Sequence, residues 1–173
     1  SVHQIVACPG NAGMSGISIC RRLPFKDNID LVRYCKDKID LAVVGSSKFV
    51  EDGTVDALVL AGIPVIGPAE DAGRIETSKA FAAKFMTRHH IPSPRTHIVV
   101  NADEIAAAFA ADSTIRVVKC DGYSHGIGVV VSDSLEEARK NAMALLKSYG
   151  PPLILQEKLV GVECSYNILT DGQ

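Results

Sequence analysis

The most informative stretch of the chain is residues 114–131, which read Thr-Ile-Arg-Val-Val-Lys-Cys-Asp-Gly-Tyr-Ser-His-Gly-Ile-Gly-Val-Val-Val. β-Branched residues on both sides of three glycines predict two strands joined as a hairpin. Lys119 ends the first strand, and Gly122, Gly126 and Gly128 let successive backbone N–H groups approach an anion. A P-loop would instead place its lysine after the last glycine and before a helix. The pattern therefore indicates a phosphate-holding hairpin, with a glycine-rich hairpin that binds no ligand as the alternative.

The composition limits the class of protein. A chain of 173 residues with 47% hydrophobic and 22% charged residues is typical of one or two small soluble domains. The net charge of −2 gives no electrostatic reason to expect nucleic acid or an anionic membrane as a partner. The longest apolar run, residues 57–66, contains Gly62 and Pro64 and is shorter than the roughly 20 residues that span a bilayer. No signal peptide is visible at Ser1.

The five cysteines are isolated from one another in the sequence, with no C-x-x-C pair. Their odd number and wide spacing favour neither a disulfide framework nor a zinc site. A reducing, cytoplasmic location is the setting that this pattern predicts.

The first third of the chain alternates between short apolar runs and helical patterns. Strands are expected at residues 4–8, 39–45 and 63–67, with helices at 30–38 and 53–61. This β-α-β-α-β order predicts a parallel sheet with right-handed crossovers. The first strand runs directly into a glycine-bearing loop, which is where open α/β sheets bind ligands, although a tight turn without a ligand fits the same residues.

The remaining chain predicts a second α/β unit. A helical region reaches about residue 90 and is stopped by Pro92 and Pro94. Capping boxes at Asn101 and Ser134 begin two further helices, to about residues 111 and 148. Strands are expected at 96–100, 115–119, 129–131, 153–157 and 162–170, with a hairpin turn at 171–172.

Several segments, taken in this order, resemble the phosphoribosylamine–glycine ligase (glycinamide ribonucleotide synthetase) family of ATP-grasp enzymes. The similar segments are residues 7–13 (Ala-Cys-Pro-Gly-Asn-Ala-Gly), 40–45, 62–68, 78–92, 118–122 with 126–129, 156–163 and 169–172. The resemblance implies an α/β fold, in which a partial Rossmann-like parallel sheet precedes the small α+β subdomain of an ATP-grasp fold. It implies a substrate-side domain at 1–72, a helical linker at 73–95 and an incomplete ATP-grasp subdomain at 96–173.

The resemblance also implies an activity, which is the ATP-dependent ligation of glycine to 5-phosphoribosylamine through an acyl phosphate in purine biosynthesis. Its small-molecule partners would be ATP, glycine and phosphoribosylamine, with Mg²⁺ as the metal, and no nucleic acid or membrane. The implied ATP-binding residues are Lys79, Lys119, Gly122, Gly126, Gly128, Gln156, Glu157, Leu159 and Glu163, and the implied substrate-binding residues are Pro9, Gly10, Asn11 and Gly13. Without the resemblance, Lys79 also fits a solvated helix residue, and Glu163 also fits a surface strand residue.

The chain departs from the family pattern at four places. The family's opening strand is absent, Gly45-Ser46-Ser47 stands where the family has Gly-Pro-Glu, Ile127 replaces a loop lysine, and Gln156 replaces a glutamate. The family's Mg²⁺ ligands would lie beyond Gln173, so we expect no catalytic or metal residue within this chain and no complete ligase reaction by it alone.

Two other functions and one physical consequence follow from these departures. A non-catalytic nucleotide-binding or interaction module of the same fold is one alternative, and another ATP-grasp carboxylate–amine ligase or carboxylase is the second. A chain that looks truncated at both ends, without the first strand, should also expose a sheet edge through which copies could associate.

Overall fold

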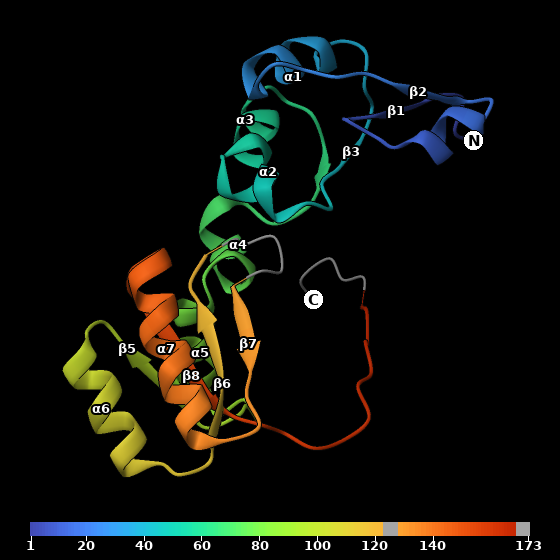
Figure 1. Cartoon of the computed structure of the whole chain (residues 1–173). Helices are drawn as coiled ribbons and strands as arrows, with labels where there is room; N and C mark the ends of the chain where they lie inside the picture. The colour runs from blue at the N-terminus through green and yellow to red at the C-terminus, as the bar shows by residue number, and fades with distance from the viewer. Residues whose placement is uncertain (123–127, 169–173) are drawn as a thin grey trace. The chain divides into compact units, whose positions relative to one another are not determined.

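The computed structural model describes residues 1–122 and 128–168 and divides into two compact units, Ser1–Thr77 and Ser78–Gln173 (Figure 1). The expected division into 1–72, 73–95 and 96–173 stays a prediction. Around the linker expected at 73–95, the structure has two separate helices. They are α4 (Glu70–Thr77) in the first unit and α5 (Lys79–Arg88) in the second.

The first unit contains parallel strands, as the sequence predicts, but they form two small sheets instead of one. β1 (Ile5–Ala7) pairs with β2 (Cys20–Arg22), and β3 (Ala42–Val43) pairs with β4 (Val65–Ile66). No hydrogen bonds join the two pairs among the described residues, so the expected single sheet is corrected to two two-stranded sheets. The sequence analysis also missed β2, because its Cys-Arg-Arg composition carries little apolar signal.

Short helices complete the first unit. They are the 3₁₀ helix η1 (Ala12–Gly16), α1 (Asn28–Cys35), α2 (Ser47–Glu51), α3 (Thr54–Leu60) and α4. Asp27 caps α1, because its side chain accepts a hydrogen bond from the backbone N–H of Asp30 at 2.9 Å. The core of the unit lies around α1 and α3, where Leu31, Cys35 and Leu58 pack together.

The second unit is built on one four-stranded antiparallel sheet in the order β5-β8-β6-β7. Its elements after α5 are β5 (Thr96–Val99), α6 (Ala102–Ala111), β6 (Ile115–Cys120), β7 (Val129–Val131), α7 (Leu135–Tyr149) and β8 (Leu153–Glu157). The predicted hairpin is confirmed, since Val117 pairs with Val131 and Lys119 with Val129. Helices α6 and α7 pack against each other and against the sheet (Figure 1).

The core of the second unit is the larger of the two. Central strand β8 contributes Leu153, Ile154 and Leu155, whose exposed fractions are all 0%. Both predicted capping boxes form: the Asn101 side chain accepts from Glu104 N at 2.9 Å, and Ser134 Oγ accepts from Glu137 N at 3.1 Å.

The strand expected at 162–170 is not present over its described part. Residues 162–168 follow β8 as an irregular segment in which Val162 is 98% and Tyr166 87% exposed. Their alternation of apolar and polar residues suits a strand, but no described strand lies alongside to accept their hydrogen bonds. Residues 169–170 and the turn expected at 171–172 lie outside the described residues, as do Gly126 and Ile127.

None of the helices in the described part of the chain combines the length and apolar character that a bilayer-crossing segment needs.

Candidate functional site

Two lysines far apart in sequence lie close together in the second unit. Lys79 is the first residue of α5, and Lys119 lies in β6 one residue before the strand ends. The Lys79 ammonium donates a hydrogen bond to the carbonyl oxygen of Gly122 at 2.7 Å. Burial and, second, the positive charge of Lys79 hold the pKa of Lys119 below its ordinary value. The structure therefore brings together Lys79, Lys119 and Gly122, all three predicted as site residues.

Asp121 explains why the helix and the hairpin meet at this point. Its carboxylate accepts hydrogen bonds from Ser78 Oγ at 3.0 Å and from the backbone N–H of Ala80 at 3.0 Å. Ser78 in turn caps α5 by accepting from Phe81 N at 3.1 Å. The start of α5 is thus tied to the end of β6. Sequence reasoning missed Asp121, because an aspartate before a glycine reads as an ordinary turn residue.

The site carries more positive than negative charge. The Asp121 carboxylate is engaged by Ser78 and Ala80, while neither Lys79 nor Lys119 forms an ion pair with a carboxylate among the described residues. Two half-buried ammonium groups held side by side repel one another, and an anion placed between them would relieve that repulsion. The described geometry therefore suits a phosphate group better than a neutral ligand.

Two of the predicted adenine-side residues are engaged within the sheet. Gln156, in β8, is 7% exposed, and its side-chain amide donates to Thr96 Oγ1 at 2.8 Å. The Glu157 carboxylate accepts from the Arg95 backbone N–H at 2.8 Å and from the Arg95 guanidinium at 3.0 Å. These contacts, the backbone one first, lower the pKa of Glu157. Both side chains hold β5 against β8, which leaves only backbone groups for a ligand.

Two further predicted nucleotide contacts, Leu159 and Glu163, lie beyond β8 in the exposed segment. Leu159 is 65% exposed, and Glu163 is exposed and forms no ion pair with another described residue. The structure does not bring them to the lysine pair. Gly128 lies directly before β7, and its carbonyl accepts from Cys120 N at 2.7 Å.

The predicted substrate-side loop lies in the first unit, directly after β1. Asn11 caps η1 by accepting from Met14 N at 3.2 Å. Gly10 has a φ of +64°, and a Cβ at this position would lie 3.0 Å from Arg22 Cγ, so the tight fit there calls for glycine. Arg22 Nε donates to the carbonyl of Pro9 at 3.4 Å. Arg22 is a second residue that sequence reasoning missed, and no motif marks it.

A magnesium site would need several hard oxygen ligands close together. Within residues 1–122 and 128–168, no three His, Cys, Asp or Glu side chains are grouped so that they could hold a metal ion. The described residues therefore contain no ready-made cluster of metal ligands.

The two units, with their parallel strand pairs and four-stranded antiparallel sheet, have the mixed α/β fold of ATP-grasp proteins. Two family models cover the chain: the N domain of phosphoribosylglycinamide synthetase matches residues 1–76, and its ATP-grasp (A) domain matches residues 77–173. The chain therefore belongs to the phosphoribosylglycinamide synthetase family.

Individual relatives agree with this assignment. The chain is 37% identical over 173 residues to phosphoribosylamine–glycine ligase of Streptomyces coelicolor, covering 99% of this chain and 40% of the relative. It is 33% identical to the trifunctional purine biosynthetic protein adenosine-3 of Homo sapiens, covering 99% of this chain and 18% of that protein. The solved phosphoribosylamine–glycine ligase of Thermotoga maritima superposes with a TM-score of 0.70 at 27% identity, covering 92% of this chain and 39% of that one. The chain thus spans less than half the length of these relatives.

Proposed function

We propose that this chain takes part in the ATP-dependent ligation of glycine to 5-phosphoribosylamine through an acyl phosphate. The second unit would bind the phosphates of ATP, and the loop of Pro9, Gly10, Asn11 and Gly13 would contribute to the phosphoribosylamine side. The observation that carries the proposal is the lysine pair, which Asp121 holds at the base of the hairpin. Family membership supports it independently.

In this reaction the chain's residues position and neutralise charge. Lys79 and Lys119 would offset part of the triphosphate charge, each through a charge-assisted contact worth about 1.5–3 kcal/mol. Gly122, Gly126 and Gly128 would give backbone N–H groups access to the phosphates. The backbone of residues 156–159 would contact adenine, and Glu163, an acceptor when ionised, would bind the ribose hydroxyls. Transfer of the phosphoryl group to glycine also requires ligands for Mg²⁺, which we expect from residues outside this chain.

A second function remains open, namely a nucleotide-binding module without ligase activity. It is favoured by Ile127 and Ser46-Ser47, which stand where the family has charged residues. For either function we infer a cytoplasmic location, supported by five free thiols.

Calorimetric titration of the full chain with ATP and Mg²⁺ tests the shared step. Lys119→Ala should weaken ATP binding by about tenfold or more, as expected when a charge-assisted contact is lost. Lys140→Ala provides the matched control, because this exposed lysine lies on α7 and belongs to neither the hairpin nor α5. Equal affinity in all three proteins would refute the assignment of the lysine pair to ATP phosphates.

A further inference from the structure

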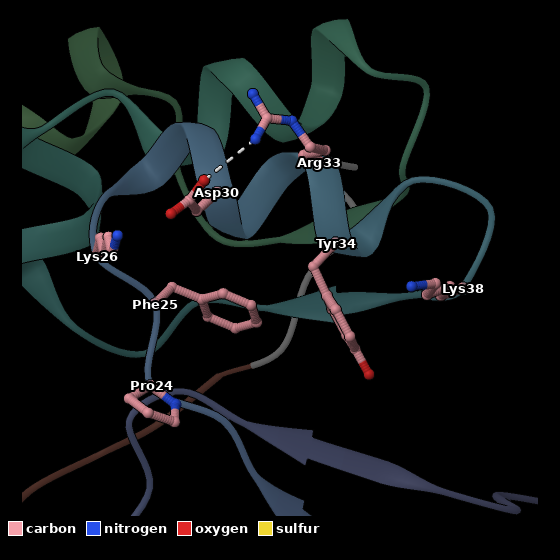
Figure 2. Close-up of a pocket in the computed structure, with 7 residues that line it drawn as sticks. All are labelled: Pro24, Phe25, Lys26, Asp30, Arg33, Tyr34 and Lys38. Carbon is pink, nitrogen blue, oxygen red and sulfur yellow. Dashed lines mark hydrogen bonds and ion pairs between the residues drawn. The ribbon is translucent and has the colours of Figure 1, made fainter.

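The first unit contains an open pocket of about 440 Å³ beside α1 (Figure 2). Two aromatic rings line it, Phe25 from the segment between β2 and α1 and Tyr34 from the last turn of α1. The volume falls within the range of small-molecule pockets. None of its lining residues belongs to the lysine pair or to the loop after β1, so no role in the proposed ligase reaction accounts for it.

The two rings form a firm apolar wall. Their centroids are 5.3 Å apart and their planes are inclined by 50°. Both side chains are only half-buried, and both pack against the core cluster around Leu31 and Cys35. That packing holds one side of each ring, while the pocket side stays open to a ligand. A planar ring is the chemical group that stacks best on such a wall.

The charge around the rings favours an anion. Arg33 and Asp30 form an ion pair at 3.3 Å and so offset each other. Lys26 and Lys38 also line the pocket, and within the described part of the chain neither has a carboxylate in ion-pair distance. The Lys38 ammonium lies 4.7 Å from the centre of the Tyr34 ring. In Figure 2 the two rings lie between these two lysines.

We propose that this pocket binds a small aromatic anion of the nucleoside monophosphate class. The base would pack against Phe25 and Tyr34, stacked on one ring and inclined to the other, and the phosphate would lie against Lys26 or Lys38. Both parts of such a ligand find a partner in the lining, since the rings offer a stacking surface to the base and the lysines offer positive charge to the phosphate. The pocket shares no residue with the ATP-phosphate site, so this proposal stands or falls independently of the proposed function.

The test uses the full chain carrying Lys119→Ala, which weakens nucleotide binding at the hairpin, and the reading of signals from residues 24–38 separates the two sites. Three probes are titrated while backbone amide signals are followed by NMR: AMP, ribose 5-phosphate (the anion without the base) and adenosine (the base without the anion). AMP should give saturable shifts in residues 24–38, and each of the other two probes should bind at least tenfold more weakly. Equal binding of ribose 5-phosphate, equal binding of adenosine, or no saturable shift with AMP would overturn the proposal.

Variants then assign the contacts. Lys26→Gln and Lys38→Gln should each weaken AMP binding up to about fivefold, as expected for exposed charge pairs. Tyr34→Leu should weaken it about tenfold, because one stacking surface is lost. The lysine variants change only exposed side chains, so they decide the question even if Tyr34→Leu fails to fold. AMP shifts that persist unchanged in the double lysine variant would also refute the site.

Discussion

Replacement of Asp112 by asparagine should make the second unit less stable at neutral pH and less sensitive to acid. Asp112 is the residue that ends α6, and its side chain is 8% exposed. One carboxylate oxygen accepts from the backbone N–H and the hydroxyl of Thr114, at 2.9 and 2.5 Å, and the other lies 3.2 Å from His97 Nε2. These contacts, those from Thr114 first, lower the pKa of Asp112 from 3.8 to about 2.

The size of the effect follows from that pKa. A tenfold change in proton affinity is worth about 1.4 kcal/mol, so the ionised carboxylate contributes about 2 kcal/mol to the free energy of unfolding at pH 7. Because the folded-state pKa is depressed, this contribution is fully present above the unfolded-state value and is lost as the pH falls through about 2. Between pH 5 and pH 2 the loss amounts to about 2 kcal/mol.

The assay must report on the second unit alone, since two units need not unfold together. Urea titrations meet this need when unfolding is followed by NMR through the backbone amide signals of β5, β6 and β8. The titrations are run on the wild-type chain and on Asp112→Asn at several pH values from 7 to 2. The difference in unfolding free energy should be largest at pH 7 and shrink steadily below pH 4. A difference that stays constant over this range would refute the argument, because a purely steric effect of asparagine does not depend on pH.

Three further predictions come from other parts of the chain. Lys79→Met should raise the pKa of Lys119, because a neighbouring positive charge is removed. Titration of the Lys119 side-chain NMR signals measures this pKa, and an unchanged value would show that burial alone lowers it. Gly73→Ala should destabilise the first unit by about 1–3 kcal/mol in thermal unfolding, because the new Cβ would collide with Val50 Cγ1, whereas a gain in stability would show that α2 can move aside. Val43 is a strand residue of the first unit and is 71% exposed. If copies of the chain associate through the edges of these strand pairs, Val43→Lys should shift sedimentation toward the monomer, whereas a wild-type chain that is already monomeric would contradict edge association.

The parts of the fold with local signals could be predicted from the sequence. The hairpin around Lys119 followed from glycines between β-branched runs, and the helices at Asn101 and Ser134 followed from capping boxes that form as expected. The arrangement of the first unit could not be predicted, because pairing between distant strands depends on tertiary contacts that periodicity does not encode. The segment 162–168 has the alternation of a strand but lacks a described partner, which shows that pattern alone does not make a sheet.

Tertiary contacts also limit what the sequence reveals about the surroundings of the two lysines. Lys79 and Lys119 could be named from the family resemblance, but their closeness depends on Asp121, whose hydrogen bonds span about 40 positions of sequence. The family resemblance implies that Gln156 and Glu157 contact the nucleotide. In the structure their side chains are already engaged in holding β5 to β8. Spacing along the chain reveals neither kind of contact.

The tie between Asp121 and the start of α5 has a consequence for how the chain should behave in ordinary buffers. It holds two like charges together in advance of any ligand, so the folded unit stores electrostatic repulsion that an anion releases on binding. Any multivalent anion with access to the hairpin then acts as a stabiliser by mass action, and the melting temperature rises with its concentration. Inorganic phosphate or pyrophosphate in a purification buffer would therefore bind and stabilise the folded protein. The melting temperatures of variants can then be compared only in buffers that contain the same anion at the same concentration.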